Sequence, residues 1–133
     1  MIVDTSAIIA ILRAEPERER CLWALERALH RIVSAGTLLE ATVVADRMPS
    51  PTFALRFDQF LLDQGVTVEP VTENQVKIAR LAYRRYGKGR DHPAKLNFGD
   101  CFAYALARDK NEPLLFVGDD FTHTDIRSAL DPG

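Results

Sequence analysis

Acidic side chains stand where one predicted secondary-structure element gives way to the next. They are Asp4, Glu40, Asp100 and the adjacent pair Asp119 and Asp120. If these carboxylates converge, they cannot all stay ionised without a cation, because like charges a few ångströms apart raise one another's pKa. Oxygen ligands without Cys or His favour a hard ion, Mg²⁺ or its substitute Mn²⁺. The acids therefore predict a site at which a metal ion activates water and polarises a phosphodiester.

Each acid also has a local explanation that needs no metal. Asp4 can cap a helix that begins at the next residue. Glu40 lies three residues after Thr37, which is the spacing of a capping box. Asp100 in a first helical turn and Asp119 in a turn are both favoured there by local hydrogen bonding and the helix dipole. The acids indicate metal chemistry only as a set.

Short β-rich apolar runs alternate with segments of helical period, which is typical of an α/β domain around a mainly parallel sheet. The expected order is strand, helix, helix, repeated three times and followed by a last strand and helix. Strands are predicted at residues 1–4, 31–35, 66–70 and 114–118, and helices at 17–29, 37–47, 52–64, 73–86 and 99–110. A capping-box spacing at Thr72 and Gln75 marks the start of one helix.

This pattern places most of the acids at the same edge of the predicted sheet. Asp4, Glu40 and the Asp119–Asp120 pair follow predicted strands, and the carboxyl ends of parallel strands meet where open α/β folds bind their ligands. Asp100 instead follows a segment without apolar period, residues 87–97, which must be a loop. Long loops in compact domains are often functional, so this one is a candidate ligand-facing segment, with a merely solvated loop as the alternative.

The composition sets the remaining limits. With 133 residues the chain has room for one core, so a single domain over residues 1–133 is expected. A net charge of −2 gives no global attraction to nucleic acid. Cys21 and Cys101 have no paired spacing and are expected to be buried apolar residues. No signal peptide or apolar run long enough to span a bilayer is found, so we expect a cytoplasmic protein without a membrane partner.

Four segments of the chain together carry a resemblance to a known family. They are MIVDTSA at residues 1–7, SAGTLLEA at 34–41, LNFGDCFAYA at 96–105 and LLFVGDDFTHTDI at 114–126. In this order they resemble the PIN-domain family, and within it the VapC-type ribonuclease toxins of type II toxin–antitoxin pairs. The resemblance spans essentially the whole chain. It implies a three-layer α/β/α domain that hydrolyses RNA phosphodiesters with one or two Mg²⁺ or Mn²⁺ ions.

The resemblance also implies roles for the acids. By motif position, Asp4 and Asp100 would ligate the metal directly, and Glu40 would bind the ion or orient a water molecule on it. Asp119 and Asp120 would supply a fourth acidic group. Asp120 matches the family's constant acid, which makes Asp119 an unusual extra one, and which of the two faces the site stays open.

Polar residues beside these acids belong to the same motifs. Thr5 and Ser6 could hydrogen-bond the ligated carboxylates, and helix capping is an equally good role for them. Asn97 is expected to be structural at a helix start, and Asp125 is a further candidate for contact with the site.

The family implies partners as well. They are the RNA substrate, a VapB-type antitoxin that projects a basic residue towards the carboxylates, and a second copy in a homodimer. Helices with Trp23, Phe53, Phe57 and Phe60 could supply an apolar interface, although core packing explains such aromatics more often. RNA would approach through basic residues that offset the repulsion by the acids. These are Arg13, Lys88, Arg90, His92 and Lys95.

Two other function classes were weighed. A phosphotransferase with an aspartyl nucleophile also begins with an Asp after the first strand, but Asp4-Thr5-Ser6 lacks the second Asp that such enzymes carry two positions on. A catalytically silent PIN scaffold that only binds the antitoxin is the other alternative, and the presence of all the acids argues against it.

Overall fold

The computed structural model describes residues 1–130, so the last three residues of the predicted single domain lie outside the described part. Strands and helices alternate along the chain as the sequence predicts. In order they are β1 (Ile2–Val3), α1 (Thr5–Leu12), α2 (Arg18–Arg27), β2 (Ile32–Ser34), α3 (Ala35–Asp46), α4 (Pro51–Asp63), β3 (Thr67–Glu69), α5 (Glu73–Tyr86), α6 (Phe98–Lys110) and β4 (Leu114–Leu115).

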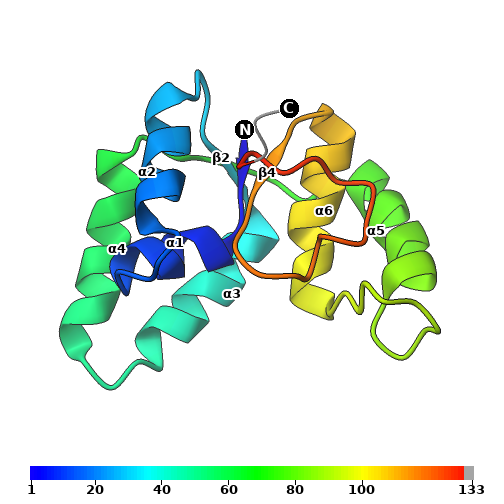
Figure 1. The fold of residues 1–133 in the computed structure, drawn as a ribbon, viewed down its shortest axis with the longest axis horizontal. Coiled ribbons are helices and arrows are strands. Elements are labelled where there is room, and N and C mark those ends of the chain that lie inside the picture. The colour runs from blue at the N-terminus through cyan, green and yellow to red at the C-terminus, as the bar shows by residue number, and fades with distance from the viewer. Residues whose placement is uncertain (131–133) are drawn as a thin grey trace.

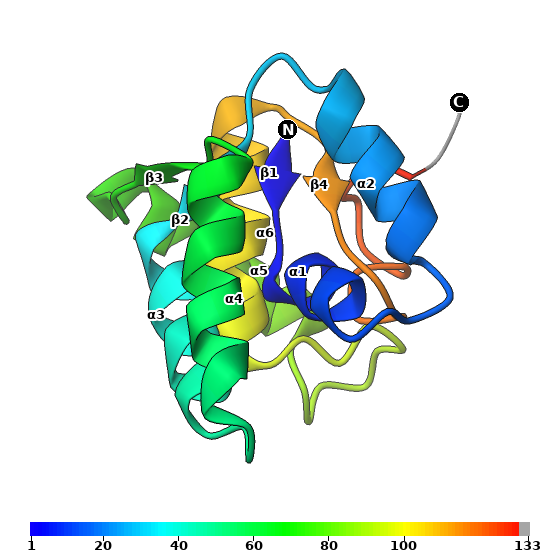
Figure 2. The ribbon, with the colours of Figure 1, turned by 90° about the vertical axis from the view of Figure 1, so that its left-hand side faces the viewer.

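The strands form one parallel sheet in the order β3-β2-β1-β4. Ile2 of the central strand β1 pairs with Ile32 on one side and with Leu114 on the other. Figure 1 shows α1, α2 and α4 on one side of the sheet and α5 and α6 on the other. Figure 2 shows α3 running beside α4. The predicted three-layer α/β/α fold with a parallel sheet is confirmed.

The two faces of the sheet bury two separate cores, because successive strand residues point to opposite sides. Val3 and Leu115 pack with the helices α1 to α4. Ile2 and Leu114 pack with α5 and α6. Burial on both faces explains why the strands read as continuous apolar runs rather than alternating ones.

Polar side chains start the helices that carry the acids. Asp4 caps α1, Ser34 caps α3, and Asn97 caps α6. Thr72 caps α5 by accepting a hydrogen bond from the backbone N–H of Gln75, as predicted. Because α3 begins at Ala35 and is capped by Ser34, the alternative explanation of Glu40 as part of a capping box is wrong.

Other details differ from the prediction. Residues 119–130 form turns, so the helix expected after the last strand does not form in the described part of the chain. Leu114 is held from both sides, by β1 and by a bridge to Ser128, but the strand ends at Leu115 and the chain turns at Gly118 with a φ of +99°. Of the aromatics predicted for an interface, Phe53 and Phe57 are buried in the core and Phe60 packs against it, whereas Trp23 is exposed. Residues 1–130 contain no membrane-spanning helix.

Candidate active site

Four acids from different parts of the chain gather at the carboxyl edge of the sheet. Asp4 follows β1, Glu40 lies in the second turn of α3, Asp100 lies in the first turn of α6, and Asp120 follows β4. Asp120, Asp4 and Glu40 are all near enough to Asp100 for their charges to raise its pKa. The tertiary structure therefore brings together residues that are up to 116 positions apart in the sequence.

Asp4 is held in place by the helix that it caps. Its carboxylate accepts hydrogen bonds from the Ser6 hydroxyl at 2.6 Å and the Ser6 backbone N–H at 3.2 Å. The Ser6 hydroxyl oxygen in turn accepts from the backbone N–H of Val117 at 3.0 Å, which ties α1 to the chain after β4. Burial raises the pKa of Asp4, and the charge of Asp120 adds to that effect. The capping role and the site role of Asp4 are thus compatible.

Asp100 is fixed by a capping box at the start of α6. Its carboxylate accepts from the backbone N–H of Asn97 at 3.0 Å, and the Asn97 side chain accepts from the backbone N–H of Asp100 at 2.9 Å. Burial, followed by the charges of the three neighbouring acids, raises the pKa of Asp100 to about 7 despite this hydrogen bond. The predicted structural role of Asn97 at the helix start is confirmed.

Glu40 reaches the cluster through the close approach of α3 to α6. Its carboxylate lies directly on the backbone of Gly99, so that a Cβ at position 99 would overlap the carboxylate oxygens. One turn earlier in α3, a Cβ at Gly36 would overlap the ring of Phe102 in α6. Burial, and then the charge of Asp4, raises the pKa of Glu40. Two glycines therefore permit the helix contact that delivers this acid.

Two hydroxyl groups at the helix starts have no hydrogen-bond partner within residues 1–130. They belong to Thr5 in α1 and Thr37 in α3, and both oxygens are buried. The expected hydrogen bond from the Thr5 side chain to a carboxylate is not made, and Ser6 alone supplies it. Buried polar groups normally have a partner. The Thr5 and Thr37 hydroxyls are exceptions to this rule.

The acids form an open cluster and not a closed coordination shell. Among the described residues, no three His, Cys, Asp or Glu side chains stand in the tight arrangement of a ready-made cation site. Mg²⁺ is commonly held by one or two carboxylates, with waters and substrate oxygens completing its coordination. An all-oxygen donor set with raised pKa values, which a cation would lower, fits such an ion.

Other residues expected at the site lie elsewhere. Asp119 is not among the charges that raise the pKa of Asp4 or Asp100, whereas Asp120 is. Asp125 accepts a hydrogen bond from the Tyr104 hydroxyl at 2.6 Å and makes no hydrogen bond to the four acids. Arg13 follows the far end of α1, about 12 Å along the helix from its capping acid.

The loop between α5 and α6 is anchored at both ends and basic at its tip. A bridge joins Gly87 to Leu96, and Leu96 is fully buried. His92 packs edge-on against Tyr86, with ring centroids 5.0 Å apart, and its Nδ1 accepts from a backbone N–H, so the structure gives it a packing role. The other predicted RNA contacts of this loop are exposed. They are Lys88, Arg90 and Lys95.

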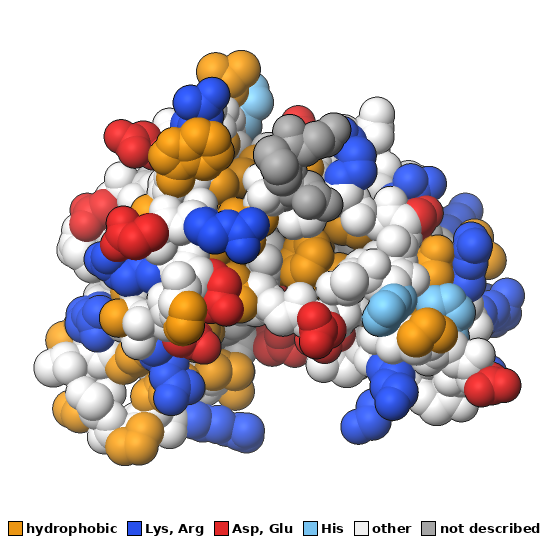
Figure 3. Space-filling model, in the orientation of Figure 1, with side chains coloured by type: hydrophobic (Ala, Val, Ile, Leu, Met, Phe, Trp, Pro, Cys, Tyr) orange, Lys and Arg blue, Asp and Glu red, His pale blue; other side chains and the backbone are white. Residues whose placement is uncertain are grey.

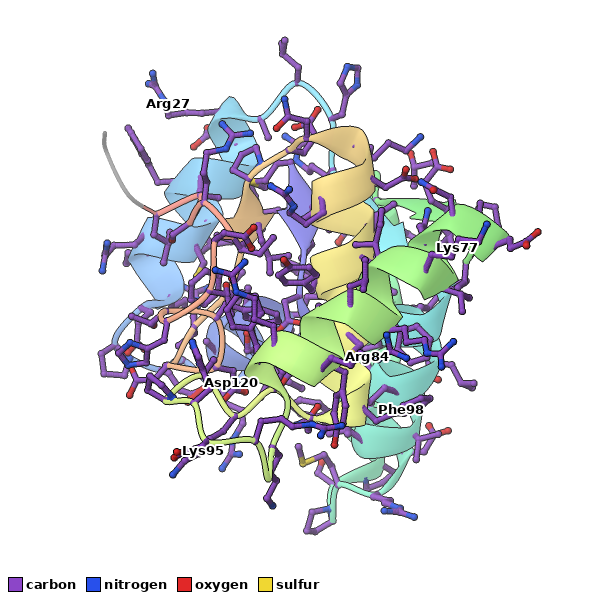
Figure 4. All side chains as sticks on the ribbon, turned by 90° about the vertical axis from the view of Figure 1, so that its right-hand side faces the viewer. Arg27, Lys77, Arg84, Lys95, Phe98 and Asp120 are labelled. Atoms are coloured by element: carbon purple, nitrogen blue, oxygen red, sulfur yellow. The ribbon has the colours of Figure 1, made fainter. Side chains whose placement is uncertain are left out.

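Acidic and basic surfaces lie close together around a hollow. Figure 3 shows a hollow at the lower edge of the molecule, with acidic side chains at its head and basic side chains on both sides. Figure 4 shows Lys95 and Asp120 towards the same end of the molecule. A polyanion could therefore contact basic side chains while one of its phosphates lies at the acids.

The sequence profile of the PIN domain matches residues 1–127. The chain belongs to the PIN-domain family. Among its relatives in this family it is 50% identical to ribonuclease VapC28 and 48% identical to ribonuclease VapC42, both of Mycobacterium tuberculosis, and it aligns over 98% and 97% of its length with 98% of each of them. It is therefore a VapC-type member of the PIN-domain family, as the sequence resemblance implied.

Solved structures of PIN-domain proteins share the fold. The chain matches VapC20 of Mycobacterium tuberculosis, a toxin that cleaves the sarcin–ricin loop, with a TM-score of 0.73 and 22% identity over 94% of this chain and 95% of that one. It matches VapBC2 of Rickettsia felis bound to promoter DNA with a TM-score of 0.71 and 11% identity over 96% and 94%. At these identities the likeness supports the PIN fold alone.

Sequence reasoning missed the residues that make the PIN cluster possible. In the sequence, Gly36 and Gly99 stand out only as members of motifs, although each accommodates a side chain of the opposite helix. The spacing of Thr37 predicts only a helix cap, although its hydroxyl oxygen is buried without a partner in residues 1–130. A glycine directly before the acid of α6 was the available signal, because glycine inside a helix is unfavourable unless it serves close packing.

Proposed function

We propose that this protein is a Mg²⁺-dependent endoribonuclease, with Mn²⁺ as a substitute, and that it is the toxin of a VapBC-type pair in the cytoplasm. The observation that carries this proposal is the gathering of Asp120, Asp4 and Glu40 near the buried Asp100, whose pKa is raised by its burial and by these charges. A group of like charges with two buried members, Asp4 and Asp100, is unfavourable by itself and becomes favourable when it binds a divalent cation. The VapC relatives named as ribonucleases support the choice of RNA as substrate.

The four acids would divide the work by position. Asp4 and Asp100 are the most buried and the most firmly hydrogen-bonded, so they would hold the ion. Glu40 and Asp120 are more exposed and near enough to Asp100 to raise its pKa, and they would accept a proton from the attacking water or orient it. The bound ion would polarise the phosphodiester and lower the pKa of the water. No protein nucleophile is required.

Removal of divalent metal tests this assignment. The purified protein with an excess of EDTA should cleave RNA at a background rate, and added Mg²⁺ or Mn²⁺ should restore cleavage, because the acids repel phosphate without a cation. Release of a fluorescent fragment from a labelled RNA measures both rates. Full activity in EDTA would contradict the mechanism. Binding of antitoxin without any metal-stimulated cleavage would favour the silent scaffold instead.

The exposed basic side chains of the α5–α6 loop would guide RNA to the acids. In the triple variant Lys88→Ala, Arg90→Ala, Lys95→Ala, RNA affinity should fall and its salt dependence should flatten. Each lost contact to a phosphate of single-stranded RNA lowers the slope of log affinity against log salt by about 0.7. Fluorescence anisotropy between about 50 and 200 mM salt measures the slope, and replacing the exposed Lys77 of α5 by Ala is a matched control. An unchanged slope in the triple variant would remove this role.

Partners follow from the family and from exposed apolar side chains. A solved toxin–antitoxin complex with this fold supports a VapB-type antitoxin as partner. A homodimer would need an apolar face, and Val76 of α5 and Phe98 of α6 are exposed by 55% and 76% beside one cavity of about 430 Å³. Figure 4 shows Phe98 on the surface beside α3. Light scattering measures the mass of the protein in solution. The parent protein should have the mass of a dimer, and Phe98→Asp should have that of a monomer. A monomer mass for the parent would exclude the dimer.

A further inference from the structure

A row of polar residues leads along α6 away from the acid cluster. Asp100, Tyr104 and Arg108 are spaced four residues apart and therefore lie on one face of the helix, over about 12 Å. Asp100 belongs to the proposed site, but Tyr104 and Arg108 have no part in it. Tyr104 is buried, whereas the guanidinium of Arg108 is half-exposed and is the kind of group that contacts nucleotides.

The chain after β4 follows the same face of α6. Asp120 lies close to Asp100 at one end of the row. At the other end, Asp125 accepts a hydrogen bond from Tyr104 at 2.6 Å and lies 3.6 Å from the Arg108 guanidinium. Figure 1 shows this segment, coloured orange to red, passing along α6 towards α5. The row on α6 is thus bordered by a second polar segment along its length.

The row ends in a pocket between α5 and α6. Its volume is about 290 Å³, which is enough for a nucleobase or a ribose phosphate. Arg85 and Arg108 provide two positive charges beside it, and the lining is completed by Ile78, Leu81, Ala82, Tyr86, Tyr104 and Asp125. Arg85 lies over the Tyr86 ring at 5.1 Å, and within residues 1–130 no carboxylate pairs with it. We call this site the Arg85–Arg108 pocket.

We infer that the Arg85–Arg108 pocket binds a nucleotide of single-stranded RNA a few residues along the strand from the cleaved bond. Guanidinium groups bind phosphate through two parallel hydrogen bonds, and the apolar side chains beside them suit a base or ribose. The pocket lies at the far end of the row that begins at Asp100, about 12 Å along α6, a distance that a few nucleotides of one strand can cover. This inference rests on the proposed ribonuclease function and adds a subsite that selects longer RNA.

Binding without cleavage tests the subsite by itself. In an Asp4→Asn background with EDTA, the probe is a fluorescent eight-nucleotide single-stranded RNA of mixed sequence. Arg85→Gln and Arg108→Gln should each weaken its binding about tenfold, which corresponds to about 1.4 kcal/mol. Lys77→Gln on the opposite part of α5 and Arg27→Gln on α2 are matched controls that should leave binding unchanged. Equal affinity of both pocket variants and the parent would overturn the inference.

Substrate length provides the second measurement. A dinucleotide cannot span the distance from Asp100 to Arg108, so the two pocket variants should cleave it at the parental kcat/KM while losing about tenfold on the eight-nucleotide RNA. An equal loss on both substrates would mean a structural role and would contradict the subsite. If no variant and no parent cleaves either RNA but the binding loss persists, the ribonuclease proposal fails while the nucleotide pocket stands.

Discussion

Replacing Asp100 by Asn is expected to abolish RNA cleavage and, at the same time, to make the metal-free fold more stable. The variant keeps the size of the side chain and can still accept the hydrogen bond from Asn97. It removes one of the two acids that would hold the ion, and loss of several kcal/mol of charge stabilisation by a metal lowers the rate about 10³-fold or more. A core residue with no site role would show the opposite combination, with reduced stability and retained activity.

The stability change follows from the direction of the pKa shift. Burial and the neighbouring acids raise the pKa of Asp100 from its ordinary value of 3.8 to about 7. The stabilising contribution of a carboxyl group with a raised pKa is fully present only at a pH below its ordinary pKa. For Asp100 this contribution is lost as the pH rises to about 7. The parent should therefore lose stability between these limits, and the Asn variant, in which only Asp4 and Glu40 keep raised pKa values, should lose less. At neutral pH we expect the variant to be more stable by about 1 kcal/mol, after allowance for solvent screening around an open site.

Urea unfolding in EDTA, followed by circular dichroism at about pH 5 and about pH 8, measures this difference. Asp109→Asn is a matched control, because that acid also lies on α6 but bonds to Asn74 and Gln75 far from the cluster. Addition of Mg²⁺ should stabilise the parent more than the Asp100 variant, since a ligand that binds the native state stabilises it. An Asp100→Asn protein that still cleaves RNA, or that is less stable than the parent at neutral pH, would refute the assignment.

Replacing Gly99 by Ala is expected to lower cleavage by one to two orders of magnitude, about 10- to 100-fold, through its effect on Glu40. The added methyl group would occupy the place of the Glu40 carboxylate, which must then turn away from Asp100. The backbone itself favours the change, because alanine is better than glycine within a helix. The variant should thus fold with near-parental stability and bind RNA normally, while its kcat falls.

A double-mutant cycle identifies the cause. If Gly99 acts only by giving room to Glu40, then Gly99→Ala should cost nothing further in a Glu40→Ala protein, whose shortened side chain leaves the space empty. Cleavage rates of the four proteins, measured at saturating RNA, give the coupling. Additive losses would show that the alanine disturbs the start of α6, and parental activity in the single variant would show that Glu40 is not needed at this position.

Much of the fold could be predicted from local signals. The parallel α/β arrangement follows from apolar runs that alternate with helical periods, and Thr72 with its hydrogen bond to Gln75 begins α5 as its spacing predicts. The last predicted helix was wrong because the residues after β4 satisfy their backbone groups in turns, for example at Thr124. Turns of this kind have no hydrophobic period, so a sequence pattern does not detect them.

By itself the sequence determined the layered fold, the positions of the acids at element boundaries, and the family. The tertiary structure alone decided which acids share a site, because their distances depend on how α3 and α6 meet across the sheet. It brought the charge of Asp120 near Asp100, paired Asp125 with Tyr104, and let Gly99 make room for Glu40. Local hydrogen bonding specifies where a helix begins, but charges on different elements interact only once packing has brought them within a few ångströms.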